Sequence, residues 1–176
     1  MYKRIFLLIG VVIFLSAVTL AQNTKAERKA AVKAKKEAEI VAGETRFNKA
    51  VSAIEAKDFV IFVDVLGHTQ KINRDPTNFL SYETDFVFLQ GYAAGNQYTN
   101  KLTVSKYSQT TDKYGNVTIS MQVRGFYIDE RIEISLKKGD NIAEVNVIPS
   151  NRGCFYYSGE LVPRSESDYF KRPNEI

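Results

Sequence analysis

Hydrophobic and polar residues alternate along much of the chain after residue 59, which is the pattern of half-buried β-strands. It is clearest at 117–124, where Val117, Ile119, Met121 and Val123 alternate with Thr118, Ser120, Gln122 and Arg124. The segments 132–136 and 143–147 repeat the alternation, and further strands are expected at 59–65, 79–83, 86–90, 102–110 and 155–162. We therefore expect a sheet that is covered on one face and solvated on the other.

Turn-forming residues separate these segments. Thr84-Asp85, the glycine-containing stretch 91–100, and the polar stretches 111–116 and 137–141 all fall between expected strands. Glycine and asparagine tolerate the left-handed backbone that tight hairpin turns need. The pattern predicts a mainly β fold, an antiparallel meander that closes as a sandwich or a barrel. Asp112 and the pair Asp129-Glu130 are expected at turns, with solvated side chains.

A helical pattern precedes the strands. Residues 23–56 contain no proline and are rich in Ala, Lys and Glu, which favour helix. Up to Ala38 the only apolar residues are alanines and Val32, so this part is predicted to be a solvated arm. Ile40, Phe47, Val51 and Ile54 then fall at helical spacing, which predicts one helix docked on the β domain from Ile40 onward. Gly43 should weaken the helix between the two parts.

The N-terminus has the pattern of a signal peptide. Lys3 and Arg4 precede an apolar run of the length of a signal-peptide core, and small residues follow up to Ala21. We expect cleavage after Ala21 and export to the periplasm or beyond the cell. The predicted organisation is a signal peptide at 1–21, a basic helical arm at 22–38, a β domain with its docked helix at 39–172, and a tail at 173–176.

The basic charge is confined to the N-terminal part of the chain. The formal net charge is +4, of which Lys3 and Arg4 contribute +2 and residues 25–36 contribute +5, which leaves −3 for the rest. A nucleic-acid-binding domain normally has a basic face of its own, so we expect no nucleic-acid partner. From this basic arm we expect a mature protein that is soluble or loosely associated with the envelope. Its basic residues are Lys25, Arg28, Lys29, Lys33, Lys35 and Lys36.

The composition offers little for catalysis or metal binding. Cys154 and His68 are the single cysteine and histidine, too few for an intramolecular disulfide or for a site of several His and Cys ligands. Neither has an evident catalytic partner, and no phosphate-binding loop or nucleophile motif is present. We therefore expect no cofactor and no metal.

Asp64, Tyr92 and Tyr98 are the candidate ligand-binding residues. Asp64 lies at the end of a strand that is apolar on both faces, so its carboxylate is expected to be half-buried, either bonded to the backbone or an arginine or facing a ligand in a barrel mouth. Tyrosines near loops can stack on ligands, although strands also favour them. The expected function is a non-enzymatic periplasmic or cell-envelope binding module. The alternative is a hydrolase whose carboxylates at Asp64, Asp129 or Glu130 converge in one cleft.

Several landmarks together resemble the Bacteroidetes family called domain of unknown function 4251. They are Phe59-Val60 with Asp64, Asn78-Phe79, the turn at 111–117, Gly139 with Ala143-Glu144-Val145, and Ser158-Gly159-Glu160-Leu161-Val162-Pro163 before Ser167 and Phe170-Lys171. The resemblance extends over roughly Ala38 to Arg172. It implies a small exported protein with no assigned activity, and it supplies no catalytic residue.

Overall fold

The computed structural model describes residues 2–150 and 153–176, with side chains described from Lys25 onward. The chain divides into two compact units, Met1–Ala42 and Gly43–Ile176. The side chains of the predicted signal peptide and its cleavage site at Ala21 lie outside the described residues, so cleavage stays a prediction. Within the part that is described, no helix is long and apolar enough to cross a membrane.

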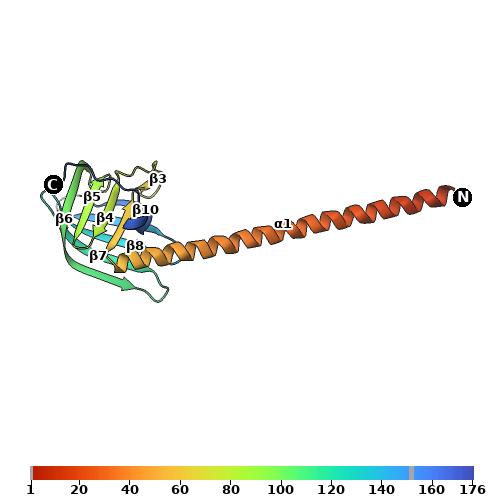
Figure 1. Ribbon diagram of the computed structural model, residues 1–176, viewed down its shortest axis with the longest axis horizontal. Coiled ribbons are helices and arrows are strands. Elements are labelled where there is room, and N and C mark those ends of the chain that lie inside the picture. The colour runs from red at the N-terminus through yellow and green to blue at the C-terminus, as the bar shows by residue number, and fades with distance from the viewer. Residues whose placement is uncertain (1, 151–152) are drawn as a thin grey trace. The chain divides into compact units, whose positions relative to one another are not determined.

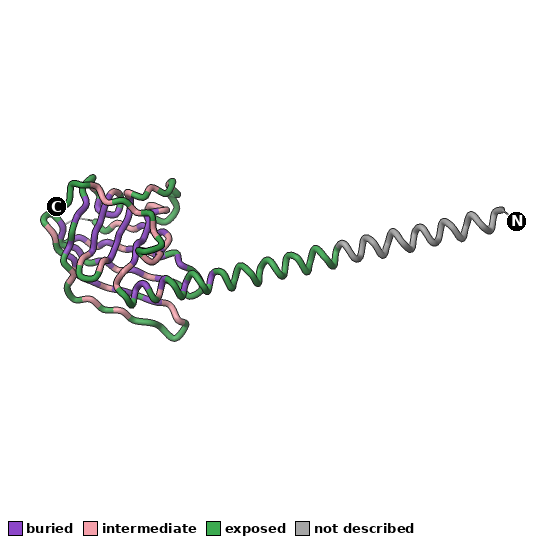
Figure 2. The backbone as a smooth tube through the Cα atoms, viewed as in Figure 1, coloured by how far each residue is buried: buried purple, intermediate pink, exposed green. Residues whose placement is uncertain are grey.

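One long helix, α1 (Tyr2–Glu55), runs through both units and ends within one residue of the predicted position. In the first unit, every side chain from Lys25 to Ala42 is exposed (Figure 2). This was expected up to Ala38, because that part has almost nothing large to bury. In the second unit, Phe47, Ala50, Ala53 and Ile54 are buried in the hydrophobic core. The predicted apolar stripe therefore docks on the β domain from Phe47 onward.

The predicted start of the docked segment at Ile40 is wrong, because the Ile40 side chain is 53% exposed. Burial begins at Gly43, where a Cβ atom would lie 2.7 Å from the carbonyl oxygen of Gly139. The missing side chain lets the helix backbone approach the turn at Gly139, and Ile40 lies almost one helical turn before this point. Gly43 thus allows the helix to pack closely against this turn, and the helix continues through it without a break.

The β-strands form an eight-stranded antiparallel barrel (Figure 1). The barrel order is β1-β4-β5-β6-β7-β8-β9-β10, and pairing between β1 and β10 closes it. Of the two arrangements left open by the sequence, a sandwich or a barrel, the barrel is confirmed. The barrel strands are β1 (Asp58–Phe62), β4 (Phe79–Glu83), β5 (Phe86–Gly91), β6 (Asn96–Thr111), β7 (Val117–Arg124), β8 (Asp129–Leu136), β9 (Ile142–Pro149) and β10 (Phe155–Pro163). A short hairpin of β2 (Val65–Leu66) and β3 (Gln70–Lys71) extends from β10.

The barrel interior is filled by side chains from alternate positions. On β7 the residues Val117, Ile119, Met121 and Val123 are buried, and the intervening residues are exposed or half-buried. The inward-facing residues of the other strands join them and the docked helix in one core (Figure 2). A filled interior leaves the two ends of the barrel and its outer wall as the places where a ligand can bind.

A second, smaller cluster explains why the first strand is apolar on both faces. Val60, Phe62, Phe79 and Phe88 point outward and pack with Phe86, Val162 and Tyr169. The segment after β10, which begins with the 3₁₀ helix η1 (Arg164–Glu166), supplies Tyr169. The ring of Tyr169 lies edge-on to Phe79 with centroids 4.9 Å apart. The C-terminal segment therefore covers the outer wall at β1, β4 and β5.

The two ends of the barrel differ. The docked part of α1 covers one end, beside the β8–β9 turn. Because neighbouring strands run in opposite directions, every second connection between them lies at the same end of the barrel. The other end is therefore formed by segments 63–78, 92–95 and 125–128 and by the residues that flank 151–152. We call this the helix-distal end.

Candidate functional site

Three cavities open at the helix-distal end. The hairpin cavity, of about 530 Å³, is lined by residues 124–130 with Pro149 and Ser150. The aromatic cavity, of about 590 Å³, is lined by Leu66, Gly67, Tyr92, Gly95 and residues 154–157. The polar cavity, of about 440 Å³, is lined by Asp75, Asn78, Gly91, Tyr92, Gly95, Asn96, Gln97 and Arg172. All three volumes fall in the range of roughly 300–1,000 Å³ that is typical of small-molecule sites.

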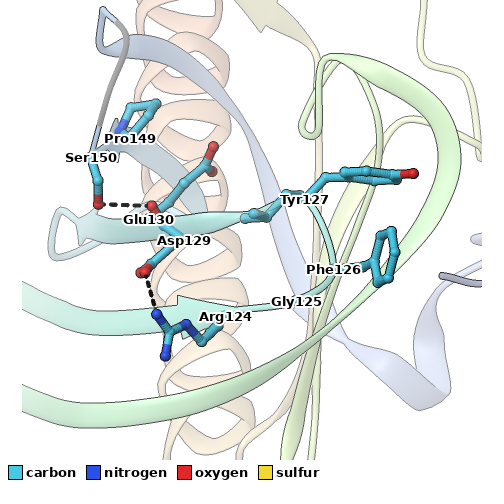
Figure 3. Close-up of a pocket in the computed structure, with 9 residues that line it drawn as sticks. Arg124, Gly125, Phe126, Tyr127, Asp129, Glu130, Pro149 and Ser150 are labelled. Carbon is cyan, nitrogen blue, oxygen red and sulfur yellow. Dashed lines mark hydrogen bonds and ion pairs between the residues drawn. The ribbon is translucent and has the colours of Figure 1, made fainter.

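The hairpin cavity contains two adjacent carboxylates that point to opposite faces of β8 (Figure 3). Asp129 is outside, where it accepts hydrogen bonds from Gln122 at 2.7 Å and Arg124 at 3.1 Å. Glu130 shares the inward face of Ile132 and Ile134 and is only 2% exposed. The predicted turn at Asp129-Glu130 is wrong, because the alternation of β8 continues through both residues. The predicted exposure is confirmed for Asp129 and wrong for Glu130, which this alternation places inside.

Tyr157 provides a second buried polar group. Its side chain is 1% exposed, and its hydroxyl has no hydrogen-bond partner in the described part of the chain. Burial and the carboxylate of Glu130 both raise the pKa of Tyr157. Tyr157 also lines the aromatic cavity. A buried polar atom without a partner costs free energy, and this hydroxyl lies in the interior with the carboxylate of Glu130 as a charged neighbour.

Two exposed aromatic side chains also lie at the helix-distal end. Phe126 and Tyr127 lie at the tip of the β7–β8 hairpin and are 79% and 73% exposed. Their rings contact each other edge to face, with the ring centroids 4.5 Å apart. Figure 3 shows both rings directed away from the ion pair at the base of the hairpin. Aromatic groups of this kind are typical of binding surfaces, because they bury a large area at little cost in side-chain entropy.

The aromatic cavity lies between the β2–β3 hairpin and the start of β10. Tyr92, Phe155, Tyr156 and Tyr157 line it, and the ring of His68 stacks on Tyr156 at 4.5 Å. Cys154, also in the lining, is an exposed free thiol. The lining is mostly apolar, which suits an aromatic or aliphatic group.

The polar cavity is formed by three segments that are distant in sequence. Asp75 accepts hydrogen bonds from the backbone N–H and the hydroxyl of Thr77, both at 2.8 Å, and these bonds together with the charge of Arg172 lower the pKa of Asp75. Arg172 donates to the hydroxyl of Thr77 and to the carbonyl of Gln97, both at 3.0 Å. The cavity therefore presents one carboxylate and one guanidinium that are both held in place.

Asp64, the first candidate from the sequence, is half-buried as expected and pairs with an arginine. Arg74 contacts its carboxylate at 2.9 Å and that of Glu160 at 2.7 Å, while the backbone N–H of Glu160 donates to Asp64 at 3.1 Å. Burial acts to raise the pKa of Asp64, but these hydrogen bonds and the charge of Arg74 lower it overall. Because the guanidinium of Arg74 also lies over the ring of Phe62, in the outer cluster, this network belongs to the outside wall.

The two candidate tyrosines are both exposed at the helix-distal end. Tyr92, in the turn between β5 and β6, is 53% exposed and lines both the aromatic and the polar cavity. Tyr98, near the start of β6, is 46% exposed, and its backbone N–H donates to Asn96. Of the three candidates, only Tyr92 lines any of the cavities described above. Ligand binding by each of them stays a prediction.

The carboxylates of the hydrolase alternative lie in three different surroundings. Asp64 is paired on the outer wall, Asp129 pairs with Arg124, and Glu130 is buried in the interior. Asp129 and Glu130 line the same hairpin cavity, but they point to opposite faces of β8, so this arrangement does not favour a pair of carboxylates acting in one cleft. Among the described residues, no cluster of three or more His, Cys, Asp or Glu side chains could hold a metal ion.

Several residues of this end were missed from the sequence. Glu130 could have been found by extending the alternation of 132–136 two residues backward, since it shares the parity of Ile132. Asp75, Asn78 and Arg172 gave no such signal, because they lie outside regular strands and meet only after the C-terminal segment has folded back.

The comparisons with known proteins identify a family without an assigned role. A crystal structure of a DUF4251 family protein from Bacteroides eggerthii is similar, with 26% sequence identity and a TM-score of 0.63, and the match covers 73% of this chain and 95% of that one. No curated protein matches. The family model called Domain of unknown function (DUF4251) matches residues 42–161. The chain belongs to the DUF4251 family.

Proposed function

We propose that this protein is an exported, non-enzymatic binding module of the periplasm or cell envelope, and that it binds its ligand at the helix-distal end of the barrel. The observation that carries the proposal is the convergence at this one end of three cavities, exposed aromatic rings and two buried polar groups. Since the interior is filled, a ligand would bind in the mouth formed by the loops.

The export part of the proposal rests on the N-terminal sequence. A positively charged start, a short apolar run and small residues up to Ala21 are typical of a cleavable signal peptide.

The basic arm supports a loose association with the envelope. Its basic side chains are exposed, and Lys33 pairs with Glu37 between side chains that are 79% and 64% exposed. The arm is therefore free to attract an anionic surface, to which each nearby basic residue adds about 1 kcal/mol. This role is separate from ligand binding at the barrel.

The proposal is tested with the chain from Gln22 to Ile176 in a thermal-shift screen of sugars, aromatic acids, fatty acids and amines. A ligand that binds the folded state raises the melting temperature by mass action. The double variant Phe126→Ser/Tyr127→Ser and the single variant Tyr92→Ser should each be compared with Tyr114→Ser, which changes an exposed tyrosine at the opposite end of the barrel. Shifts that are lost in one of the first two variants and kept in the third support the proposal. A screen with no shift, or shifts unaffected by changes at this end, contradicts it.

A further inference from the structure

The polar cavity has a lining unlike that of its neighbours. Asp75, Asn78, Asn96, Gln97 and Arg172 supply planar polar groups, and Tyr92 supplies one exposed ring. These residues come from the segment before β4, from the β5–β6 turn and the start of β6, and from the C-terminal segment.

A buried polar network fixes the C-terminal side of this cavity. Gln90 and Thr99 are both fully buried. The side-chain oxygen of Gln90 accepts the backbone N–H of Arg172 at 2.8 Å, and the hydroxyl of Thr99 donates to the Arg172 carbonyl at 2.9 Å. The amide nitrogen of Gln90 donates to the carbonyl oxygens of Thr77 and Phe170, both at 2.9 Å. The network thus ties the backbone at Arg172 to Thr77, so both sides of the cavity are held before any ligand arrives.

The polar groups of the cavity keep unused hydrogen-bonding capacity. Asn78 is 8% exposed and accepts the backbone N–H of Tyr92 through its oxygen, while its amide nitrogen donates to none of the described residues. Asp75 uses one carboxylate oxygen for both bonds from Thr77, and no described residue donates to the other oxygen. Arg172 uses two of its five side-chain N–H groups. The amide nitrogen of Asn78 is not among the buried atoms that lack a partner, so it reaches solvent and is accessible to a ligand that accepts its hydrogen bond.

The charges of the cavity favour a neutral ligand. Asp75 and Arg172 carry opposite charges, so the attraction of either one for a charged ligand is offset by the repulsion of the other. A hydroxyl group both donates and accepts hydrogen bonds, so neighbouring hydroxyls can pair with the carboxylate, the guanidinium and the amide together. The exposed ring of Tyr92 offers a flat apolar surface beside these groups, which suits the C–H face of a sugar ring.

We infer that the polar cavity binds a neutral saccharide, with Asp75, Asn78 and Arg172 as hydrogen-bonding groups and Tyr92 as the stacking surface. The inference rests on the proposed function, since it names the ligand class for one of the three cavities at the helix-distal end.

The experiment is isothermal titration of the chain from Gln22 to Ile176 with glucose, galactose, mannose, N-acetylglucosamine, maltose and cellobiose. Glucosamine and glucuronic acid serve as positively and negatively charged matches of glucose. We expect at least one neutral sugar to bind, and to bind more tightly than the charged sugars bind. Tighter binding of either charged sugar than of every neutral one would overturn the inference.

Matched variants locate the binding. Asp75→Ala and Tyr92→Ala should each weaken binding of the neutral sugar about tenfold, whereas Tyr92→Phe, which keeps the ring, and Tyr127→Ala, in the hairpin cavity, should change it less than threefold. Circular dichroism and a melting curve confirm that each variant is folded. Binding that is indifferent to Asp75→Ala and Tyr92→Ala overturns the site, and so does the absence of binding by every sugar in the panel. In the latter case, binding of another ligand class at this end would leave the proposed function standing.

Discussion

Gly91 and Asn78 are in such close contact that a Cβ atom at residue 91 would lie 1.8 Å from the side-chain oxygen of Asn78. Gly91 has a φ of +65°, and the same position is 3.0 Å from the carbonyl oxygen of Thr77. Asn78 cannot simply turn away, because it is almost buried and its oxygen accepts the N–H of Tyr92 at 3.2 Å. This contact sets the position of one wall of the polar cavity.

The contact predicts that Gly91→Ala destabilises the protein more than Gly95→Ala does. Both glycines have positive φ, which costs another residue about 1–2 kcal/mol. A Cβ at Gly95 would meet nothing within 4 Å, so only Gly91→Ala adds the cost of overpacking, about 1–3 kcal/mol. Urea unfolding of both variants measures the difference. Equal losses of unfolding free energy would show that Asn78 adjusts without cost.

The two faces of β7 predict different tolerance of charge. Val123 is fully buried in the barrel core, and Thr118 on the same strand is exposed. Val123→Asp places an unpaired charge in an apolar interior and should unfold the domain or cost more than about 4 kcal/mol. Thr118→Asp should change the unfolding free energy by no more than about 0.5 kcal/mol. Denaturant melts followed by circular dichroism check both, and similar losses in the two variants would contradict the assigned faces.

The burial pattern of α1 predicts that replacing Phe47 by alanine destabilises the protein far more than replacing Ile40 does. Phe47 is 8% exposed within the core, whereas Ile40 is 53% exposed. Phe47→Ala should lower the unfolding free energy by about 3–5 kcal/mol, and Ile40→Ala should lower it by less than about 0.5 kcal/mol.

Removal of residues 22–36 extends the same test, because the described side chains of this segment are exposed. The melting temperature should stay nearly unchanged, and salt-sensitive binding to vesicles of anionic lipid should be lost. A large fall in the melting temperature would mean that the arm packs against the rest of the protein.

The pairing of Asp64 with Arg74 predicts that the protein loses unfolding free energy in acid. Its pKa is lowered from the ordinary value of 3.8 in the folded state, so its contribution is complete above 3.8 and is lost as the pH falls through the folded-state pKa. The difference in unfolding free energy between the wild type and Asp64→Asn should therefore shrink as the pH falls below 3.8. Chemical unfolding between pH 7 and pH 2.5 measures it. Two curves that stay parallel would show that the Arg74 pair contributes nothing to stability.

The fold was largely predictable from the sequence because alternation and turn residues are local signals. The segment 79–83 matched β4 at both ends, and 117–124 matched β7. Barrel closure was not predictable, since it depends on pairing between Phe59 and Pro163, which are distant in sequence. The start of helix docking was misplaced because periodicity identifies an apolar stripe without saying where its partner surface begins.

The candidate site was predictable only in part. Tyr92 could be chosen because a tyrosine next to turn-forming glycines is visible in the sequence. Asp75 and Arg172 could not be chosen, because their proximity is created by the buried side chains of Gln90 and Thr99, which hold the C-terminal segment in place. Non-local polar networks of this kind have no periodicity along the chain.

The central claim is that the helix-distal end of the barrel is the binding site. The most direct measurement is a map of amide chemical-shift changes in ¹⁵N-labelled protein as each hit of the thermal-shift screen is added. We predict that the changes concentrate in residues 64–78, 92–97, 125–130 and 153–157, with little change in the turns at 111–116 and 137–141. Changes concentrated in those two turns or in the docked part of α1 would contradict the account.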